Sequence, residues 1–446
     1  MQAAPPLPAG VPVKMPLLHA FYLGLATLAI AALAARGRIH PFLALTGVAA
    51  VFAYASGMSV SLLGKVFGTG FGQTLNTLGL PVLGAAMVGV MSERSGAAAR
   101  LAVATAHWRG RTRGVVLTLI GVAAGSGTSA GAGFAVLGPL RTALAGNLPR
   151  RAALAMGLAV SAGQGLLLPS PVLIAATAIL AAGWVRVLAI GLPLALLSAG
   201  AGAIAAYRIA PADEAVPAAK PSSPWGAAGL VVACVTMALM LLVQSIGDIP
   251  SEPFGGGSAR ETILGAGRPL IVLLAGVAIM VAATGTWRRG GMCETGWAAE
   301  AIARAAPLML LLGAAGGLQS LAQTTHMAEL LAERVLPLGL GLAVPFLAAA
   351  IMKTLQGSSL VAAITAAGMT QPLLASLGLD SETGRALAVL AVGAGSVTVT
   401  HINDGLFWLV ADAACMRPAR ALATVSALTL LQGMGVLVAL VCVGWW

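Results

Sequence analysis

Charged and aromatic residues are scarce in this sequence, at 9% and 4% of 446 positions. A water-soluble domain carries about a quarter charged residues, so this chain has too little polar surface to cover a soluble globule. Apolar residues occupy 59% of the positions, in runs that repeatedly approach the roughly 20 residues needed to cross a bilayer. The composition therefore excludes a soluble protein and predicts an all-α polytopic integral membrane protein.

Cysteine is also rare. The four cysteines, Cys234, Cys293, Cys415 and Cys442, lie far apart and form no C-x-x-C pair, so we expect neither a disulfide framework nor a metal site. The sequence has no G-x-x-x-x-G-K-[ST] loop, which argues against ATP-driven transport by this chain. We expect no metal and no cofactor.

The net charge of +11 comes from arginines in short segments between apolar runs. These are Arg36 and Arg38; Arg109, Arg111 and Arg113; Arg150 and Arg151; and Arg288 and Arg289. This distribution is typical of loops kept on the cytoplasmic side. It predicts a multi-pass protein of the bacterial-type cytoplasmic (inner) membrane, with the lipid bilayer rather than nucleic acid as its partner. We expect the apolar run at 17–35 to be a retained helix rather than a cleaved signal.

The apolar runs predict roughly 11 to 14 transmembrane or re-entrant helical segments of bilayer-spanning composition. They fall near 17–35, 41–56, 74–91, 114–146, 152–168, 171–183, 186–207, 225–246, 268–286, 305–322, 334–352, 355–377, 386–411 and 421–445. A Pro-rich and Ala-rich break at 210–224 reads as a linker. It separates a first half, residues 1–209, from a second half, residues 225–446, within a single membrane domain.

The two halves resemble each other. L-G-A-A begins at Leu83 and at Leu312, and S-G-T-S at 126–129 corresponds to Q-G-S-S at 356–359. L-A-V-S-A-G-Q begins at Leu158 and L-A-V-G-A-G-S at Leu390. The three pairs follow the same order at nearly constant spacing. Internal repeats with Gly-interrupted apolar segments are typical of secondary transporters, and here we expect two inverted repeats.

The Gly/Ser-rich interruptions are candidates for the binding site. A broken helix in lipid leaves backbone groups unpaired unless protein or a wet cavity satisfies them, and a helix N-terminus offers N–H groups to an anion. The candidate residues here are Thr128, Ser129, Gly357, Ser358 and Ser359. Close helix packing through small residues is the alternative interpretation.

A second pair of breaks follows at the same offset, which aligns Gly163-Gln164 with Gly395-Ser396 and the segment 169–171 with 401–403. Ionisable residues at membrane depth are costly and mark functional sites. Asp404 is a helix cap, an ion-coupling group, or both, and His401 is a packed hydrogen-bonding residue, a coupling group, or both. Lys353 either attracts an anionic substrate or extends to an interface.

Three segments resemble the gluconate permease (GntP-type) family. They are residues 70–102, M-K-T-L-Q-G-S-S-L-V-A-A-I-T-A-A-G at 352–368, and A-V-G-A-G-S-V-T-V-T-H-I-N-D-G-L-F-W-L-V at 391–410. The resemblance implies a symporter of the ion-transporter superfamily with re-entrant hairpins, which imports sugar acids such as gluconate with protons. It also implies site roles for Gly357, Ser358, His401, Asn403 and Asp404.

Two departures from the family pattern concern the first half and Lys353. Gln164 and Ser170 stand where the resemblance leads us to expect loop histidines, and the segment 128–134 is uncharged. Lysine also replaces the arginine expected at 353, which removes a bidentate carboxylate clamp. We therefore expect the titratable chemistry at His401 and Asp404.

The sequence as a whole predicts a secondary active transporter, not an enzyme, that imports gluconate or a related small sugar acid or hydroxycarboxylate by proton symport. A sodium-coupled carrier of carboxylates or of amino acids such as D-serine is the alternative within the same fold. A channel or a membrane enzyme is a remote alternative, and a homodimer is left open. The expected substrate-binding residues are Thr128, Ser129, Gln164, Ser170, Gly357, Ser358, Ser359 and Asn403. Ion coupling is assigned to His401 and Asp404, and anion attraction to Lys353.

Overall fold

The computed structural model describes residues 16–35, 39–105, 107–127, 129–145, 148–209, 224–247, 257–285, 287, 291–327, 330, 333 and 340–444. Every regular element in these ranges is helical, which confirms the predicted all-α class. Residues 210–223 of the predicted linker at 210–224 lie outside the described residues, as do Thr128 and the arginines at 36, 38, 288 and 289. The division into two halves therefore stays a prediction.

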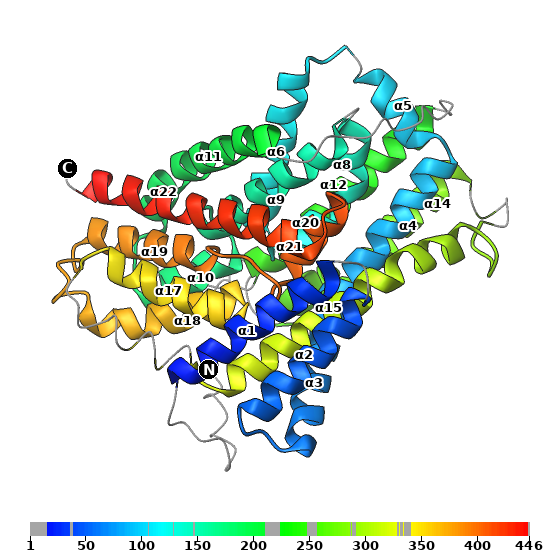
Figure 1. The fold of residues 1–446 in the computed structure, drawn as a ribbon. Coiled ribbons are helices and arrows are strands. Elements are labelled where there is room, and N and C mark those ends of the chain that lie inside the picture. Colours follow the sequence, from blue (N-terminus) through cyan, green and yellow to red (C-terminus); the bar gives the residue numbers. More distant parts are fainter. Residues whose placement is uncertain are drawn as a thin grey trace.

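The helices follow one another along the whole chain (Figure 1). They are α1 (Pro16–Ala35), α2 (Pro41–Ala55), α3 (Val60–Thr74), the π-helical turn η1 (Leu75–Gly79), α4 (Leu80–Arg94), α5 (Ala97–Ala104), α6 (Gly110–Gly127), α7 (Ala130–Val136), α8 (Gly138–Ala145), α9 (Pro149–Leu166), α10 (Pro171–Ile179), α11 (Trp184–Ile209), α12 (Pro224–Gly247), α13 (Ser258–Ala266), α14 (Pro269–Thr284), α15 (Trp297–Thr324), α17 (Ala343–Gln356), α18 (Ser359–Thr370), the 3-10 turn η4 (Gln371–Leu373), α19 (Glu382–Ser396), α20 (Gly405–Ala413), α21 (Pro418–Ala421), the π-helical turn η5 (Leu422–Ser426) and α22 (Ala427–Gly444). Several begin with proline, whose missing N–H is no loss at the first helical position.

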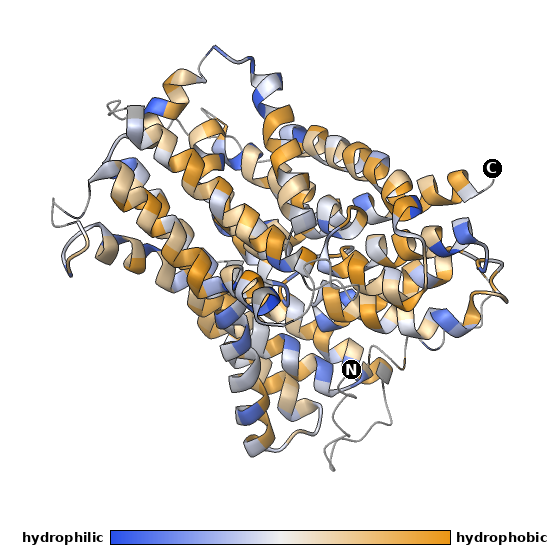
Figure 2. Ribbon diagram, turned by 180° about the vertical axis from the view of Figure 1, so that it is seen from behind, coloured by the Kyte–Doolittle hydropathy of each residue, from blue (hydrophilic) through white to orange (hydrophobic). Residues whose placement is uncertain are grey.

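Six of the described helices are long and apolar enough to cross a membrane, and a bent pair, α13 with α14, makes up to seven. The six spans are Val60–Arg94, Pro149–Ile179, Trp184–Ile209, Trp225–Gln244, Trp297–Thr324 and Pro418–Gly444. Hydrophobic residues predominate along most of the helical ribbon in Figure 2, and Leu197 and Val438 are 70% and 61% exposed. Such exposure suits lipid contact, so the protein is a multi-pass membrane protein. The predicted 11 to 14 segments also included re-entrant half-helices and shorter apolar helices, such as Leu17–Ile30, Pro41–Ala55 and Ala343–Gln356.

The predicted interruptions are real helix breaks. One falls between α6 and α7, a second between α9 and α10, a third between α17 and α18, and a fourth between α19 and α20. A Cβ placed on Gly163 of α9 would lie 2.1 Å from the carbonyl oxygen of Val122 on α6. One placed on Gly395 of α19 would lie 2.3 Å from that of Phe346 on α17. The two glycines that the repeat aligns therefore serve the same close helix packing, while the inverted orientation of the repeats stays a prediction.

The breaks lie near the middle of the molecule, between three groups of helices. Figure 1 shows α1, α2, α3 and α15 at one side, α4, α5, α12 and α14 at another, and α17, α18, α19 and α22 at a third. Helices α3 and α15 cross closely, since a Cβ on Gly70 would lie 2.4 Å from the Gly316 carbonyl oxygen. Small residues allow such an approach, and this crossing brings the polar residues that follow Gly70 and Gly316 to the central breaks.

Candidate functional site

Three helix breaks surround a cavity of about 320 Å³, which we call the central cavity. It lies at the N-terminal ends of α7, α18 and α20. Seven of the predicted site residues line it: Ser129, Gln164, Lys353, Gly357, Ser358, Ser359 and Asp404. The geometry thus brings together residues from both halves of the sequence that are 189 to 275 positions apart.

Each of the four helices that follow the breaks, α7, α10, α18 and α20, starts with a side-chain cap. The hydroxyl oxygen of Ser129 accepts a hydrogen bond from the Ala132 amide at 3.3 Å, and that of Ser358 accepts one from the Val361 amide at 3.3 Å. These caps satisfy one of the N-terminal amides that a helix leaves without intrahelical partners. The remaining first-turn amides of α7 and α18, with the positive ends of the helix dipoles, favour an anion in the cavity.

A serine-hydrolase interpretation of Ser129 does not fit this structure. The run G-T-S-A-G at 127–131 matches the pattern of a hydrolase nucleophile elbow, which needs a strand before it and a helix after it. Here the preceding element is the helix α6, and Ser129 is the N-cap of α7.

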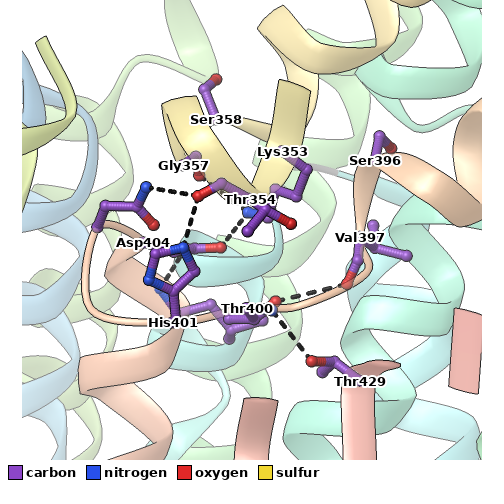
Figure 3. A network of polar contacts seen from close by, with 12 residues as sticks. Lys353, Thr354, Gly357, Ser358, Ser396, Val397, Thr400, His401, Asp404 and Thr429 are labelled. Carbon is purple, nitrogen blue, oxygen red and sulfur yellow. Dashed lines mark hydrogen bonds and ion pairs between the residues drawn. The ribbon is translucent and has the colours of Figure 1, made fainter. Parts of the chain in front are cut away.

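An ion pair in the second half forms the charged part of the central cavity. The ammonium group of Lys353 contacts the Oδ2 atom of Asp404 and donates a hydrogen bond to the Gly357 carbonyl oxygen at 2.9 Å (Figure 3). The side chains are 2% and 14% exposed. Asp404 also caps α20, since its Oδ1 atom accepts from the Leu406 amide at 2.8 Å. Lys353 is therefore a buried, paired cation at the site and does not extend to an interface.

His401 and Asn403 hold the loop before α20 against the end of α17. The Nε2 atom of His401 lies 2.6 Å from the Thr354 carbonyl oxygen, and the amide of Asn403 donates to the same oxygen at 3.2 Å. A carbonyl oxygen only accepts, so Nε2 carries the hydrogen and His401 is the donor. Figure 3 shows the histidine ring directed at Thr354.

Neither His401 nor Asn403 lines the central cavity, and Ser170 does not line it either. Ser170 is fully buried and caps α10: its hydroxyl accepts from the Leu173 amide at 3.2 Å and donates to the Gln164 carbonyl oxygen at 2.6 Å. Thr128 lies outside the described residues. These predicted site residues therefore either support the cavity wall or have no described place in it.

Sequence reasoning missed the polar wall that faces the breaks. This wall comprises Gln73, Thr74 and Thr77 of α3 and η1, Gln319, Ser320 and Gln323 of α15, and Ser161 of α9. A signal was available, because Q-T-x-x-T at 73–77 and Q-S-x-x-Q at 319–323 place polar residues on one face of an otherwise apolar helix. The π-helical turn η1 within this wall is of a kind found often at functional sites.

Leu78 closes the cavity between α7 and α20. A Cβ on Gly405 would lie 2.4 Å from the Leu78 Cδ1 atom, and one on Gly131 would lie 3.0 Å from its Cδ2 atom. Leu78 of η1 therefore packs against the first turns of both α7 and α20. Glycine at 131 and 405 is what lets it approach them.

The described residues contain no group of three or more His, Cys, Asp or Glu side chains that could hold a metal ion. What the central cavity offers is one buried ion pair, three capped helix N-termini, and a wall of amides and hydroxyls. This set suits a small molecule that carries both negative charge and hydroxyl groups.

Comparisons with known proteins identify the family of this chain. The family profile described as GntP family permease matches residues 16–443. The chain is 28% identical over 398 residues to the gluconate permease of Pseudomonas aeruginosa, covering 84% of this chain and 86% of that protein. It is 29% identical to the high-affinity gluconate transporter of Escherichia coli, covering 84% and 87%. It is 27% identical to the inner membrane permease YgbN of Escherichia coli, covering 89% and 92%.

Among solved structures, the crystal structure of the Alcanivorax borkumensis YdaH transporter covers 97% of this chain and 99% of its own length at 20% identity. Its TM-score of 0.38 is too low to carry an argument about fold. The match over residues 16–443 confirms the resemblance read from the sequence and the interpretation as a transporter rather than an enzyme. The chain belongs to the GntP permease family and is a multi-pass transporter of the bacterial inner membrane.

Proposed function

We propose that this permease imports gluconate, or a closely related small sugar acid, together with protons. The observation that carries the proposal is the buried Lys353–Asp404 ion pair at the edge of a cavity lined by hydroxyls and side-chain amides. Relatives named for gluconate transport, similar over more than four fifths of the chain, support the substrate class.

The substrate class follows from the two kinds of wall in the central cavity. A sugar acid has a carboxylate at one end and a chain of hydroxyl-bearing carbons behind it. The carboxylate fits the ammonium group of Lys353 and the amides at the start of α18, because helix N-termini and cations both favour an anion. The hydroxyls fit the polar wall of α3 and α15, where Gln73 and Gln319 offer both donors and acceptors.

The coupling follows from charge balance at the ion pair. While the site is empty, Lys353 and Asp404 neutralise each other. A substrate carboxylate that takes Lys353 leaves Asp404 without its partner, and breaking one half of a buried pair costs about 3–5 kcal/mol. A proton on Asp404 removes that charge. The carrier is then neutral when empty and neutral when it holds both substrate and proton, and these are the states that can reorient.

His401 has a positioning role in this scheme. It holds the 397–404 loop to Thr354 of α17 and thereby keeps Asp404 within reach of Lys353. Asn403 adds a second hydrogen bond to the same carbonyl. The proton is assigned to Asp404 because its carboxylate lines the cavity, whereas the His401 ring does not.

Uptake by purified protein in proteoliposomes tests the proposal. Labelled gluconate should accumulate when the outside is acidic relative to the inside, and the accumulation should collapse on addition of a protonophore. A sodium gradient imposed at equal pH should drive none. Accumulation under the sodium gradient alone would show that sodium, not a proton, is the coupling ion. Absence of gluconate uptake under both gradients would refute the substrate class.

A further inference from the structure

An apolar groove lies on the outer surface between α6 and α11. It shares no lining residue with the central cavity. Its volume is about 690 Å³, and its walls come from these two helices and Leu148. Small residues such as Gly114, Gly200 and Ala203 form much of the floor, while Leu119 and Ile204 stand at the edges, 49% and 60% exposed. We call it the α6–α11 groove.

Two arginines line one end of this groove. Arg111 is in the first turn of α6, and Arg208 is in the last turn of α11. Both are exposed, and neither forms a hydrogen bond or ion pair with any residue that the structure describes. An added Cβ on Gly114, near the start of α6, would lie 3.4 Å from the hydroxyl oxygen of Tyr207, near the end of α11. The helix ends that carry the two arginines therefore lie side by side. The groove thus has a cationic end at the helix termini and an apolar remainder.

The length of the groove matches one leaflet of a bilayer. Leu196, the far wall residue of α11, lies about 18 Å from Arg208 along the helix axis at about 1.5 Å rise per residue. One leaflet contributes about half of a hydrocarbon core of roughly 30 Å. The cationic end therefore lies at headgroup depth when the apolar part lies among acyl chains.

We propose that the α6–α11 groove is a binding site for an anionic phospholipid. Its phosphate would contact the Arg111 and Arg208 guanidinium groups, and one acyl chain would lie over Gly114, Gly200 and Ala203. Basic pockets between transmembrane helices on the cytoplasmic side bind anionic headgroups in this way. Arg111 belongs to one of the basic segments that the sequence places on that side, and Arg208 lies at the same end of the groove. Charge complementarity selects an anionic lipid over a zwitterionic one. The site is independent of the transported substrate.

Native mass spectrometry of the purified full-length protein tests both ends of the site. The protein is equilibrated with equal amounts of phosphatidylglycerol and phosphatidylcholine that carry the same acyl chains, and retained lipid is measured. Wild type should retain phosphatidylglycerol preferentially. Each arginine near an anionic lipid surface contributes about 1 kcal/mol. Arg111→Gln and Arg208→Gln should therefore each lower the ratio of retained phosphatidylglycerol to phosphatidylcholine by roughly fivefold, and the double variant should show both losses. Arg109→Gln, which removes an exposed neighbour outside the groove, should leave it unchanged.

The acyl-chain end has its own pair of variants. A Cβ on Gly200 would meet nothing within 4 Å, so the backbone there accepts a side chain, and Gly200→Leu should fill part of the groove and reduce retention of both lipids. A Cβ on Gly47 of α2 would also meet nothing within 4 Å, so Gly47→Leu is the matched control and should bind both lipids as wild type does. Equal retention of the two lipids by wild type would overturn the proposal, as would an equal effect of Arg109→Gln. A dimer that Gly200→Leu dissociates would show that a second copy, not lipid, occupies the groove.

Discussion

The ammonium group of Lys353 on α17 contacts the carboxylate of Asp404 at the start of α20, and this contact joins the two broken segments of the second half. The same lysine donates to the Gly357 carbonyl oxygen at the end of α17. One cation thus satisfies a helix C-terminus and a helix N-cap together. A substrate carboxylate that binds Lys353 must therefore compete with Asp404.

Replacing Lys353 by glutamine should reduce uptake sharply. The substrate carboxylate loses a charged partner worth about 1.5–3 kcal/mol, so KM should rise by roughly tenfold to more than a hundredfold, measured as initial uptake rate against concentration. The single variant also leaves Asp404 without its partner. Lys353→Gln combined with Asp404→Asn should recover the thermal stability lost in the single variant but not the uptake. Wild-type KM in either variant would remove Lys353 from the binding site.

Replacing Gly357 by alanine should destabilise the break between α17 and α18. Gly357 has a φ of +78°, and an added Cβ would lie 2.3 Å from the Asn403 carbonyl oxygen. Gly378 has a φ of +69° with nothing within 4 Å, so Gly378→Ala reports the backbone strain alone, about 1–2 kcal/mol. Thermal unfolding should show a distinctly larger loss for Gly357→Ala. Equal losses would mean that the contact with the 397–404 loop contributes nothing.

Replacing Gln319 by leucine should weaken binding of a hydroxylated acid selectively. Gln319 lines the cavity on α15, and one neutral hydrogen bond contributes about 1 kcal/mol, which is roughly a fivefold rise in KM for gluconate. A short carboxylate without hydroxyls, measured as a competitor of uptake, should lose much less inhibition. An equal loss for both compounds would place the Gln319 effect on the fold rather than on hydroxyl recognition.

Replacing His401 by glutamine should preserve coupling. Glutamine retains an N–H donor for the Thr354 carbonyl oxygen, so the loop stays in place and the proton-to-substrate ratio should not change. His401→Phe removes the donor and should lower both thermal stability and uptake rate. If His401→Gln exchanges substrate across the membrane but no longer accumulates it, the histidine itself carries the proton.

Much of the fold was predictable because helix breaks in lipid carry a strong local signal. Gly357-Ser358 and the segment 401–404 interrupt apolar runs with residues that only a cavity or a cap can accommodate, and both are breaks in the structure. For the same reason, the sequence could predict that candidate binding residues lie at these breaks, and seven of them line the central cavity. The sequence allows Asp404 to cap a helix, to couple an ion, or to do both. The structure shows the cap on Oδ1 and an ion pair with Lys353 on Oδ2, while ion coupling stays a prediction.

The rest depended on packing between segments far apart in the sequence. The polar wall at Gln73 and Gln319 exists because α3 and α15 cross at Gly70 and Gly316, a contact that no local pattern specifies. The direction of His401 toward Thr354 depends in the same way on how the 397–404 loop folds over α17. The repeat aligned Ser170 with the middle of that loop, whereas both Ser170 and Asp404 are N-caps.

The most direct test of coupling at the ion pair is the behaviour of Asp404→Asn in proteoliposomes. Asparagine still caps a helix but can neither hold a negative charge nor take up the proton. We expect labelled gluconate on one side of the membrane to exchange with unlabelled gluconate on the other at a rate comparable to wild type, while an imposed pH gradient no longer drives accumulation. Accumulation at the wild-type level in Asp404→Asn would contradict the assignment of proton coupling to the Lys353–Asp404 pair.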